Sequence, residues 1–293
     1  MPNSSSSSAS ISAVSAARNR VGLLALPPKT DVTGGTTTPE FDLVAVHGLN
    51  GGRWSTWTRT EDKKETMWLQ DLLPIKLPKA RVMTFGYNAN VVNNFSSFGI
   101  REHARTLLTR LKTKRDKLNG RPIVFVCHSL GGIVVKQALR LANNEKAFDD
   151  IAQSTRGILF FGTPHRGADL AFWGDIIAKI AKTVFLNPKR ELIKDLKTNS
   201  QPLVQVSEDF RPIADKYKIV SFFEEDGILG TSNLVVPRSS ALLEIPNEIP
   251  VPFEGNHMDI CRFGADDEDR FDEVWIAIRD IVGESTQGRS EDE

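Results

Sequence analysis

Cysteine, net charge and long apolar runs are all scarce in this chain of 293 residues. Its two cysteines, Cys127 and Cys261, are too few for a disulfide framework and fit a reducing compartment. Lysine plus arginine equal aspartate plus glutamate at 37 each, so the charge gives no support to a nucleic-acid partner. No apolar run reaches the ~18 residues that a membrane-spanning helix needs. With 40% hydrophobic and 25% charged residues, the chain can bury a globular core.

Acidic residues are also missing from the start of the chain, where the first is Asp31. Serines at positions 4–8 and several prolines and glycines punctuate this segment, so we expect residues 1–40 to be a disordered leader. Arg18 and Arg20 beside a Ser/Ala-rich stretch have the bias of a mitochondrial transit peptide. The segment is interpreted either as a targeting signal or as a leader with no targeting role. Residues 284–293 are expected to form a polar tail.

Short apolar runs alternate with helix-like segments from residue 41 to 283. The runs at 41–46, 80–87, 123–126, 155–162 and 218–223 suit buried strands. We therefore predict one α/β domain at 41–283, with a mostly parallel sheet and helices on both faces. Residues 168–212 have a helical pattern without a strand. They are interpreted either as a cap insertion over the active site or as one more helix packed on the sheet.

Residues 122–132, Pro-Ile-Val-Phe-Val-Cys-His-Ser-Leu-Gly-Gly, combine a buried strand, a sharp turn and a helix start. This is the context of a nucleophile elbow, in which a serine occupies a strained turn and its near neighbours are small. Ser129 is therefore the candidate nucleophile. Gly131 supplies one small neighbour, whereas Cys127 stands where a glycine is usual. The alternative is that Ser129 only caps the helix.

A serine hydroxyl needs a base to accept its proton. His257 lies in a loop after the apolar stretch at 249–253 and before the final expected helix at 272–282, where the chain order of serine, acid and histidine places the base. His165, after the strand at 155–162, is the rival. His47 is expected to be structural, and the side chain of His128 should project elsewhere.

The acid should follow a strand between the serine and the histidine. Glu224 ends the run at 218–223 and is the preferred candidate, with Glu225 and Asp226 as alternatives. In many lipases an Asp precedes a Val-Val-Pro-like segment, but here Asn233 holds that place. An amide cannot stabilise an imidazolium as a carboxylate does.

The first strand leads into a Gly-rich loop, His47-Gly48-Leu49-Asn50-Gly51-Gly52. Such a loop can bring backbone N–H groups to a developing oxyanion, together with the residue after the nucleophile. Leu49, or less directly Asn50, and Leu130 are the expected donors. The alternative is that these glycines merely turn the chain.

Six blocks together resemble the serine active site-containing (SERAC-type) α/β-hydrolases: 47–49, 127–132, 162–167, 221–224, 239–241 and 256–257. They also resemble hydrolase modules at the N-terminus of fungal NLR-like receptors and, more distantly, GPI inositol-deacylase lipases. The resemblance covers roughly residues 41–282. It implies a lipase-like hydrolase or transacylase acting on lipid or other esters. It further implies peripheral membrane contact and a mitochondrial or endoplasmic-reticulum location, with the cytoplasm as the alternative.

We therefore expect a serine hydrolase that uses Ser129, His257 and Glu224 and needs no metal and no cofactor. Its products would arise through an acyl-enzyme, which water or an alcohol releases. The alternative is a signalling or interaction module that keeps the fold while catalysis is weak or lost.

Overall fold

The computed structural model describes residues 21–28, 38–89, 97–116, 118, 120–167, 170–185, 191, 194, 200–227 and 233–283. Arg18, Arg20 and the expected tail at 284–293 lie outside these residues. The strands are β1 (Gly22–Ala25), β2 (Phe41–Val46), β3 (Thr58–Glu61), β4 (Lys64–Met67), β5 (Ala80–Gly86), β6 (Ile123–His128), β7 (Thr155–Phe161), β8 (Lys218–Glu224) and β9 (Glu248–Phe253). The helices are α2 (Trp68–Asp71), α3 (Leu73–Lys76), α4 (Ser97–Lys114), α5 (Gly131–Asn144), α6 (Asp149–Ser154), α7 (Leu170–Val184), α9 (Gln201–Ala214), α10 (Arg238–Ala241) and α11 (Glu268–Val282).

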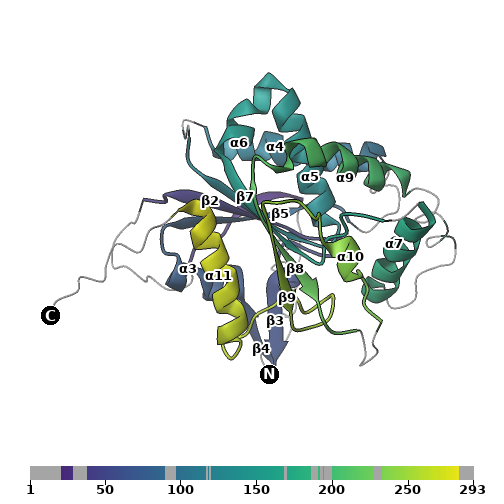
Figure 1. Ribbon diagram of the computed structural model, residues 1–293. Helices are drawn as coiled ribbons and strands as arrows, with labels where there is room; N and C mark the ends of the chain where they lie inside the picture. Colours follow the sequence, from purple (N-terminus) through teal and green to yellow (C-terminus); the bar gives the residue numbers. More distant parts are fainter. Residues whose placement is uncertain are drawn as a thin grey trace, which may run out of the picture.

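Seven strands form the central sheet in the order β1-β5-β2-β6-β7-β8-β9, and all neighbours are parallel except β1 and β5. Helices α4, α5 and α9 cover one face, and α3 and α11 cover the other (Figure 1). Alternate residues of β2 enter opposite cores: Val44 packs with the α4–α5 side, whereas Leu43 packs with the α11 side. The predicted α/β architecture is therefore present.

A buried charge cluster stands at the start of β2. The Asp42 carboxylate, which is fully buried, accepts hydrogen bonds from Arg81 Nε at 2.6 Å and from Arg115, and Arg121 approaches within 3.6 Å. Because β2 runs from Asp42 toward His47, this cluster lies at the sheet edge opposite the strand ends that carry the candidate site. It ties β2, β5 and the segment after α4 together.

Strand β1 and the β3–β4 hairpin were not predicted from the sequence. The expectation of a disordered leader is wrong for Gly22–Ala25, which form β1 and pair antiparallel with β5. The segment is short and half exposed, so its apolar pattern alone does not reveal the strand. The charged segment 61–65 belongs to the β3–β4 hairpin, in which Glu61 pairs with Lys64 and residues 62–63 make the turn. Cross-strand pairing compensates there for poor strand composition.

The expected cap at 168–212 divides into two parts. Helix α9 packs against α5, where Ser207 accepts a hydrogen bond from Lys136 and Phe210 is buried. Helix α9 therefore belongs to the helical layer that covers the sheet and is not a cap, because its apolar face packs against α5, the helix that follows Ser129. Helix α7 stands apart from that layer, beside α10 (Figure 1). Its C-terminal end contacts the loop after β2, through Asn50.

Candidate active site

Ser129 stands between the end of β6 and the start of α5, with φ at +52°. Left-handed backbone at a residue other than glycine costs roughly 1–3 kcal/mol, and neighbouring contacts must hold it. The Ser129 N–H donates to the carbonyl of Phe161 at 2.8 Å, and the Ser129 carbonyl accepts from Thr163 Oγ1 at 2.9 Å. Strand, strained turn and helix are therefore present as the nucleophile-elbow interpretation requires.

Of the two residues that lie two positions from Ser129, Cys127 and Gly131, only Gly131 must be a glycine. A Cβ on Gly131 would lie 2.4 Å from the carbonyl oxygens of Val46 and His47, so any side chain there would collide with backbone. Cys127 is instead a fully buried member of the core on the α5 side. Its side chain enters the core rather than the turn, and the elbow forms without a glycine at this position.

The imidazole of His257 reaches Ser129 from the loop after β9. Its Nε2 lies 2.9 Å from Ser129 Oγ, and its Nδ1 lies 3.4 Å from Glu224 Oε1. The second distance exceeds an ordinary N–H···O hydrogen bond, although such contacts commonly tighten when substrate binds. Gly162, with φ at +54°, leaves this space free, since a Cβ there would come 3.0 Å from Nδ1.

Glu224 is the last residue of β8, and its buried carboxylate is held by backbone donors. Oε1 accepts from the Val236 N–H at 2.6 Å, and Oε2 accepts from the Val235 N–H at 3.2 Å. Of the three candidate acids, all within the described residues, Glu224 is the one beside His257. Asp226 binds the Gly255 N–H at 2.9 Å, and Glu225 is exposed.

The loop after β2 lies directly against the elbow. A Cβ on Gly48 would come 2.8 Å from Ser129 Cβ and 3.4 Å from the Leu130 nitrogen. Within the described part of the chain, the N–H groups of Leu49 and Leu130 donate no hydrogen bond. The Asn50 N–H, by contrast, already donates to the Ala89 carbonyl at 3.1 Å. Leu49 and Leu130 therefore keep the donor capacity that an oxyanion would use, and Asn50 does not.

Burial disfavours the charged form of two further histidines near the site, His47 and His165. Burial lowers the pKa of His47 to about 4, and its ring stacks on Tyr87 at 4.4 Å between centroids, as a structural histidine would. His165 packs edge-on against Phe160, and neither of its ring nitrogens has a hydrogen-bond partner among the described residues. Burial lowers the pKa of His165 well below its ordinary value. The structure thus brings His257, and not His165, to Ser129.

The sequence did not reveal the contact that His128 makes. Its Nε2 lies 2.8 Å from the backbone carbonyl of His257, so the ring donates a hydrogen bond that fixes the histidine loop. Burial lowers the pKa of His128 to about 3, with the nearby His257 adding to the effect, which keeps the ring neutral. Its position just before Ser129 is the only signal in the sequence.

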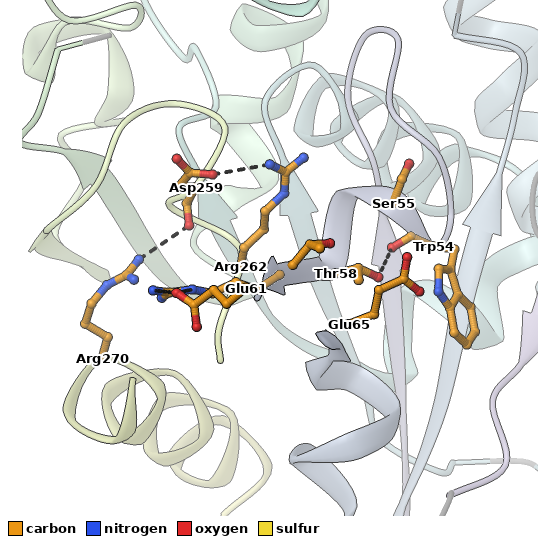
Figure 2. A pocket seen from close by; sticks show the side chains of 10 residues that line it. Trp54, Ser55, Thr58, Glu61, Glu65, Asp259, Arg262 and Arg270 are labelled. Carbon is orange, nitrogen blue, oxygen red and sulfur yellow. Dashed lines mark hydrogen bonds and ion pairs between the residues drawn. The ribbon is translucent and has the colours of Figure 1, made fainter. Parts of the chain in front are cut away.

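A polar pocket of about 680 Å³ borders the same histidine loop on its outer side. Figure 2 shows Arg262 and Arg270 on either side of Asp259, with Trp54 and Ser55 across the pocket. Arg262 pairs with the Asp259 carboxylate at 3.2 Å, and Arg270 donates to its backbone carbonyl at 3.4 Å. Ser129 and His257 do not line this pocket. The pocket is lined by charged side chains that pair with one another, and we do not assign it as the cleft that would bring a substrate to Ser129.

Within the described residues, no cluster of three or more His, Cys, Asp or Glu could hold a metal ion. The same residues include no helix both long and apolar enough to cross a bilayer. The chemistry that the site offers on its own side chains is proton transfer from an alcohol to an imidazole, beside two unoccupied backbone donors.

Comparison with known proteins bears on this geometry. Residues 42–186 match the family described as "Putative serine esterase (DUF676)". Protein SERAC1 from Bos taurus is 28% identical over 269 residues, which cover 84% of this chain and 40% of that protein. Protein SERAC1 from Homo sapiens is 29% identical over 244 residues, covering 75% and 36%. The comparisons support the SERAC-type family. The resemblance to SERAC-type proteins stated from the sequence is thereby confirmed.

This chain spans only 36–40% of the length of these relatives. Among solved structures, the Bacillus licheniformis lipase BlEst2 aligns with a TM-score of 0.52 at 16% identity, covering 87% of this chain and 97% of the other. A structure from work on Nitrososphaera gargenis carboxylesterases aligns with a TM-score of 0.50 at 11% identity, covering 90% and 95%. At such identities the likeness shows the fold, which is that of the α/β-hydrolases.

Proposed function

We propose that this SERAC-type serine hydrolase cleaves or transfers acyl groups of lipid esters through Ser129, His257 and Glu224. One observation carries the proposal: an alcohol on a strained elbow lies 2.9 Å from an imidazole that comes from 128 residues away. The two unoccupied N–H groups beside that alcohol support the same reading. A serine that only capped a helix would need neither the imidazole nor the positive φ.

In the proposed reaction, Ser129 Oγ attacks the ester carbonyl carbon while its proton passes to His257 Nε2. The Leu49 and Leu130 N–H groups would stabilise the oxyanion that forms. Collapse breaks the bond to the alkoxy oxygen, and His257 returns the proton so that the alcohol leaves. Water, or a second alcohol in a transacylase, then attacks the acyl-enzyme with His257 again as base. Glu224 would orient His257 and stabilise its imidazolium form.

The lipid part of the proposal rests on helix α7 and on the family resemblance. The neighbouring helix α7 is rich in apolar side chains, and Leu170 at its start is 47% exposed. An acyl chain could pack beside such a helix. Most apolar residues of α7 are buried in the core, including Trp173 and Ile177. Contact with a membrane surface, and a mitochondrial or endoplasmic-reticulum location, are proposals that follow from the family resemblance.

A fluorophosphonate probe tests the catalytic part of the proposal. Wild type should label, Ser129→Ala should not, and Ser239→Ala should label like wild type because Ser239 is an exposed serine on α10. Circular dichroism should show all three folded. A folded wild type that stays unlabelled would reject the enzyme and favour the interaction module.

A substrate panel tests the acyl class. Esters of short and long chain, phospholipids and acyl thioesters are compared by kcat/KM, with and without an added alcohol acceptor. Higher kcat/KM for long-chain esters supports the lipid proposal, and a new ester formed with the alcohol supports acyl transfer. Preference for thioesters would reject the ester class while leaving the triad intact.

A further inference from the structure

The loop that carries Leu49 is held by hydrogen bonds at both ends. At its start, the Tyr87 hydroxyl donates to the His47 carbonyl at 2.7 Å, and the Gly51 N–H donates back to Gly48 at 3.1 Å. At its end, the Gly52 N–H donates to Thr56 Oγ1 at 3.1 Å. The Gly48 carbonyl, which shares a peptide unit with the Leu49 N–H, also lies 3.0 Å from His47 Nδ1. None of these contacts joins the loop to helix α7.

Asn50 adds the contact that joins this loop to α7. Its φ is +51°, a left-handed conformation that Asn tolerates better than most residues. Its own N–H donates to Ala89, and its side-chain Nδ2 donates to the Val184 carbonyl at 2.8 Å. The second bond joins residues 134 positions apart, so nothing in the local sequence requires it.

Val184 is the last residue of α7, where helix carbonyls lack partners within the helix. Its carbonyl is therefore free to accept from outside. Helix α7 is anchored in the main core by buried residues, of which Trp173, Ile177 and Ile180 are at most 1% exposed. The Val184 carbonyl is thus a fixed point on a packed element, not on a loose loop.

We propose that Asn50 is a positioning residue that holds the Leu49 N–H in place for the oxyanion by tying its loop to the end of α7. The inference rests on the proposed function, because the oxyanion forms only if Ser129 acts as nucleophile. It makes α7 a structural part of the oxyanion site as well as a neighbour of the acyl group. Displacement of the α7 end would move Leu49 without touching Ser129 or His257.

Two substitutions at Asn50 separate the hydrogen bond from the backbone conformation. Asn50→Asp keeps the shape and the tolerance of positive φ, but an ionised carboxylate cannot donate to the Val184 carbonyl. Asn50→Gly keeps the conformational freedom and removes the side chain. The control is Asp62→Gly, at a residue that also has positive φ (+46°) but lies in the turn of the β3–β4 hairpin.

Both Asn50 variants should lose about 10- to 100-fold in kcat, less than the 10²–10³ that follows removal of an oxyanion donor itself. KM should change less than threefold, and affinity for a trifluoromethyl ketone inhibitor should fall in parallel with kcat/KM. Asp62→Gly should behave like wild type. Losses that appear in KM or in melting temperature instead, or kcat within twofold of wild type, would overturn the inference.

Hydrogen–deuterium exchange separates this inference from the proposed function. Amides of residues 48–52 should exchange at least tenfold faster in both Asn50 variants than in wild type, whether or not the protein turns over substrate. Unchanged exchange overturns the tether. If wild type neither labels with fluorophosphonate nor cleaves any ester, the proposed function fails, and with it the role of Asn50 in catalysis.

Discussion

Replacing Glu224 by Gln tests the acid of the proposed triad with almost no change of shape. An imidazolium at His257 lies 3.4 Å from Glu224 Oε1, so at an effective dielectric constant of about 20 the charge stabilises it by about 5 kcal/mol. Loss of that energy from the transition state lowers kcat/KM by roughly 10³- to 10⁴-fold. Because both carboxylate oxygens accept backbone N–H groups, the new amide also turns a donor toward Val235 or Val236. That mismatch costs about 1–3 kcal/mol of stability.

The assay is hydrolysis of a p-nitrophenyl ester from pH 5 to 10, with melting temperature measured in parallel. Glu225→Gln is the matched control, because Glu225 is the exposed neighbour in the chain and should keep wild-type kcat/KM. A Glu224→Gln enzyme within tenfold of wild type, or an equal loss in Glu225→Gln, would refute the assignment of the acid.

Four further changes probe what holds the site. Gly131→Ala should destabilise by about 3 kcal/mol or more, because its Cβ would meet two backbone carbonyls at 2.4 Å; urea unfolding measures it, and an unchanged midpoint contradicts the clash. Asp42→Asn should cost about 3–5 kcal/mol by leaving Arg115 buried without its charge partner, while kcat of the folded fraction stays unchanged. Lys136→Met should raise stability at pH 7 by about 1–4 kcal/mol, since burial lowers the pKa of this lysine to about 7 and penalises its charged form; a lower melting temperature would refute this. Burial lowers the pKa of His128 to about 3, so unfolding takes up a proton as the pH falls below about 6.5. The free energy of unfolding should therefore fall by about 2 kcal/mol by pH 5. His128→Gln, which can still donate to the His257 carbonyl, should flatten this pH dependence of the melting temperature.

The central sheet could be predicted because its strands are short, continuous apolar runs. A strand buried on both faces needs such a run, and the sequence shows one at each of the five strands from β2 to β8 in the parallel core. The residues at the strand ends follow from the same logic, since Ser129 and Glu224 stand at the ends of β6 and β8. Strand β1 and the β3–β4 hairpin escaped prediction because their pairing, rather than their composition, makes them strands.

Contacts across long sequence separations were outside the reach of the sequence. The bond from His128 to the His257 carbonyl and the bond from Asn50 to the Val184 carbonyl both end on backbone atoms. Every residue type carries a backbone carbonyl, so the sequence does not show which carbonyl accepts the bond. The choice among three consecutive acids had the same difficulty, because it depends on strand register at the end of β8.

Backbone groups, more than side chains, hold the candidate site in shape. Ser129 is fixed through its own N–H and carbonyl, the Glu224 carboxylate through two peptide N–H groups, and the His257 loop through its carbonyl. We therefore expect exchange of a reactive side chain to remove the proposed activity while the frame stays, so that Ser129→Ala remains folded. A side chain at Gly131 would collide with backbone atoms, so exchange of this glycine should lower stability instead of removing a reactive group. Variants at Ser129 and at Gly131 should therefore separate loss of activity from loss of stability within one turn of the chain.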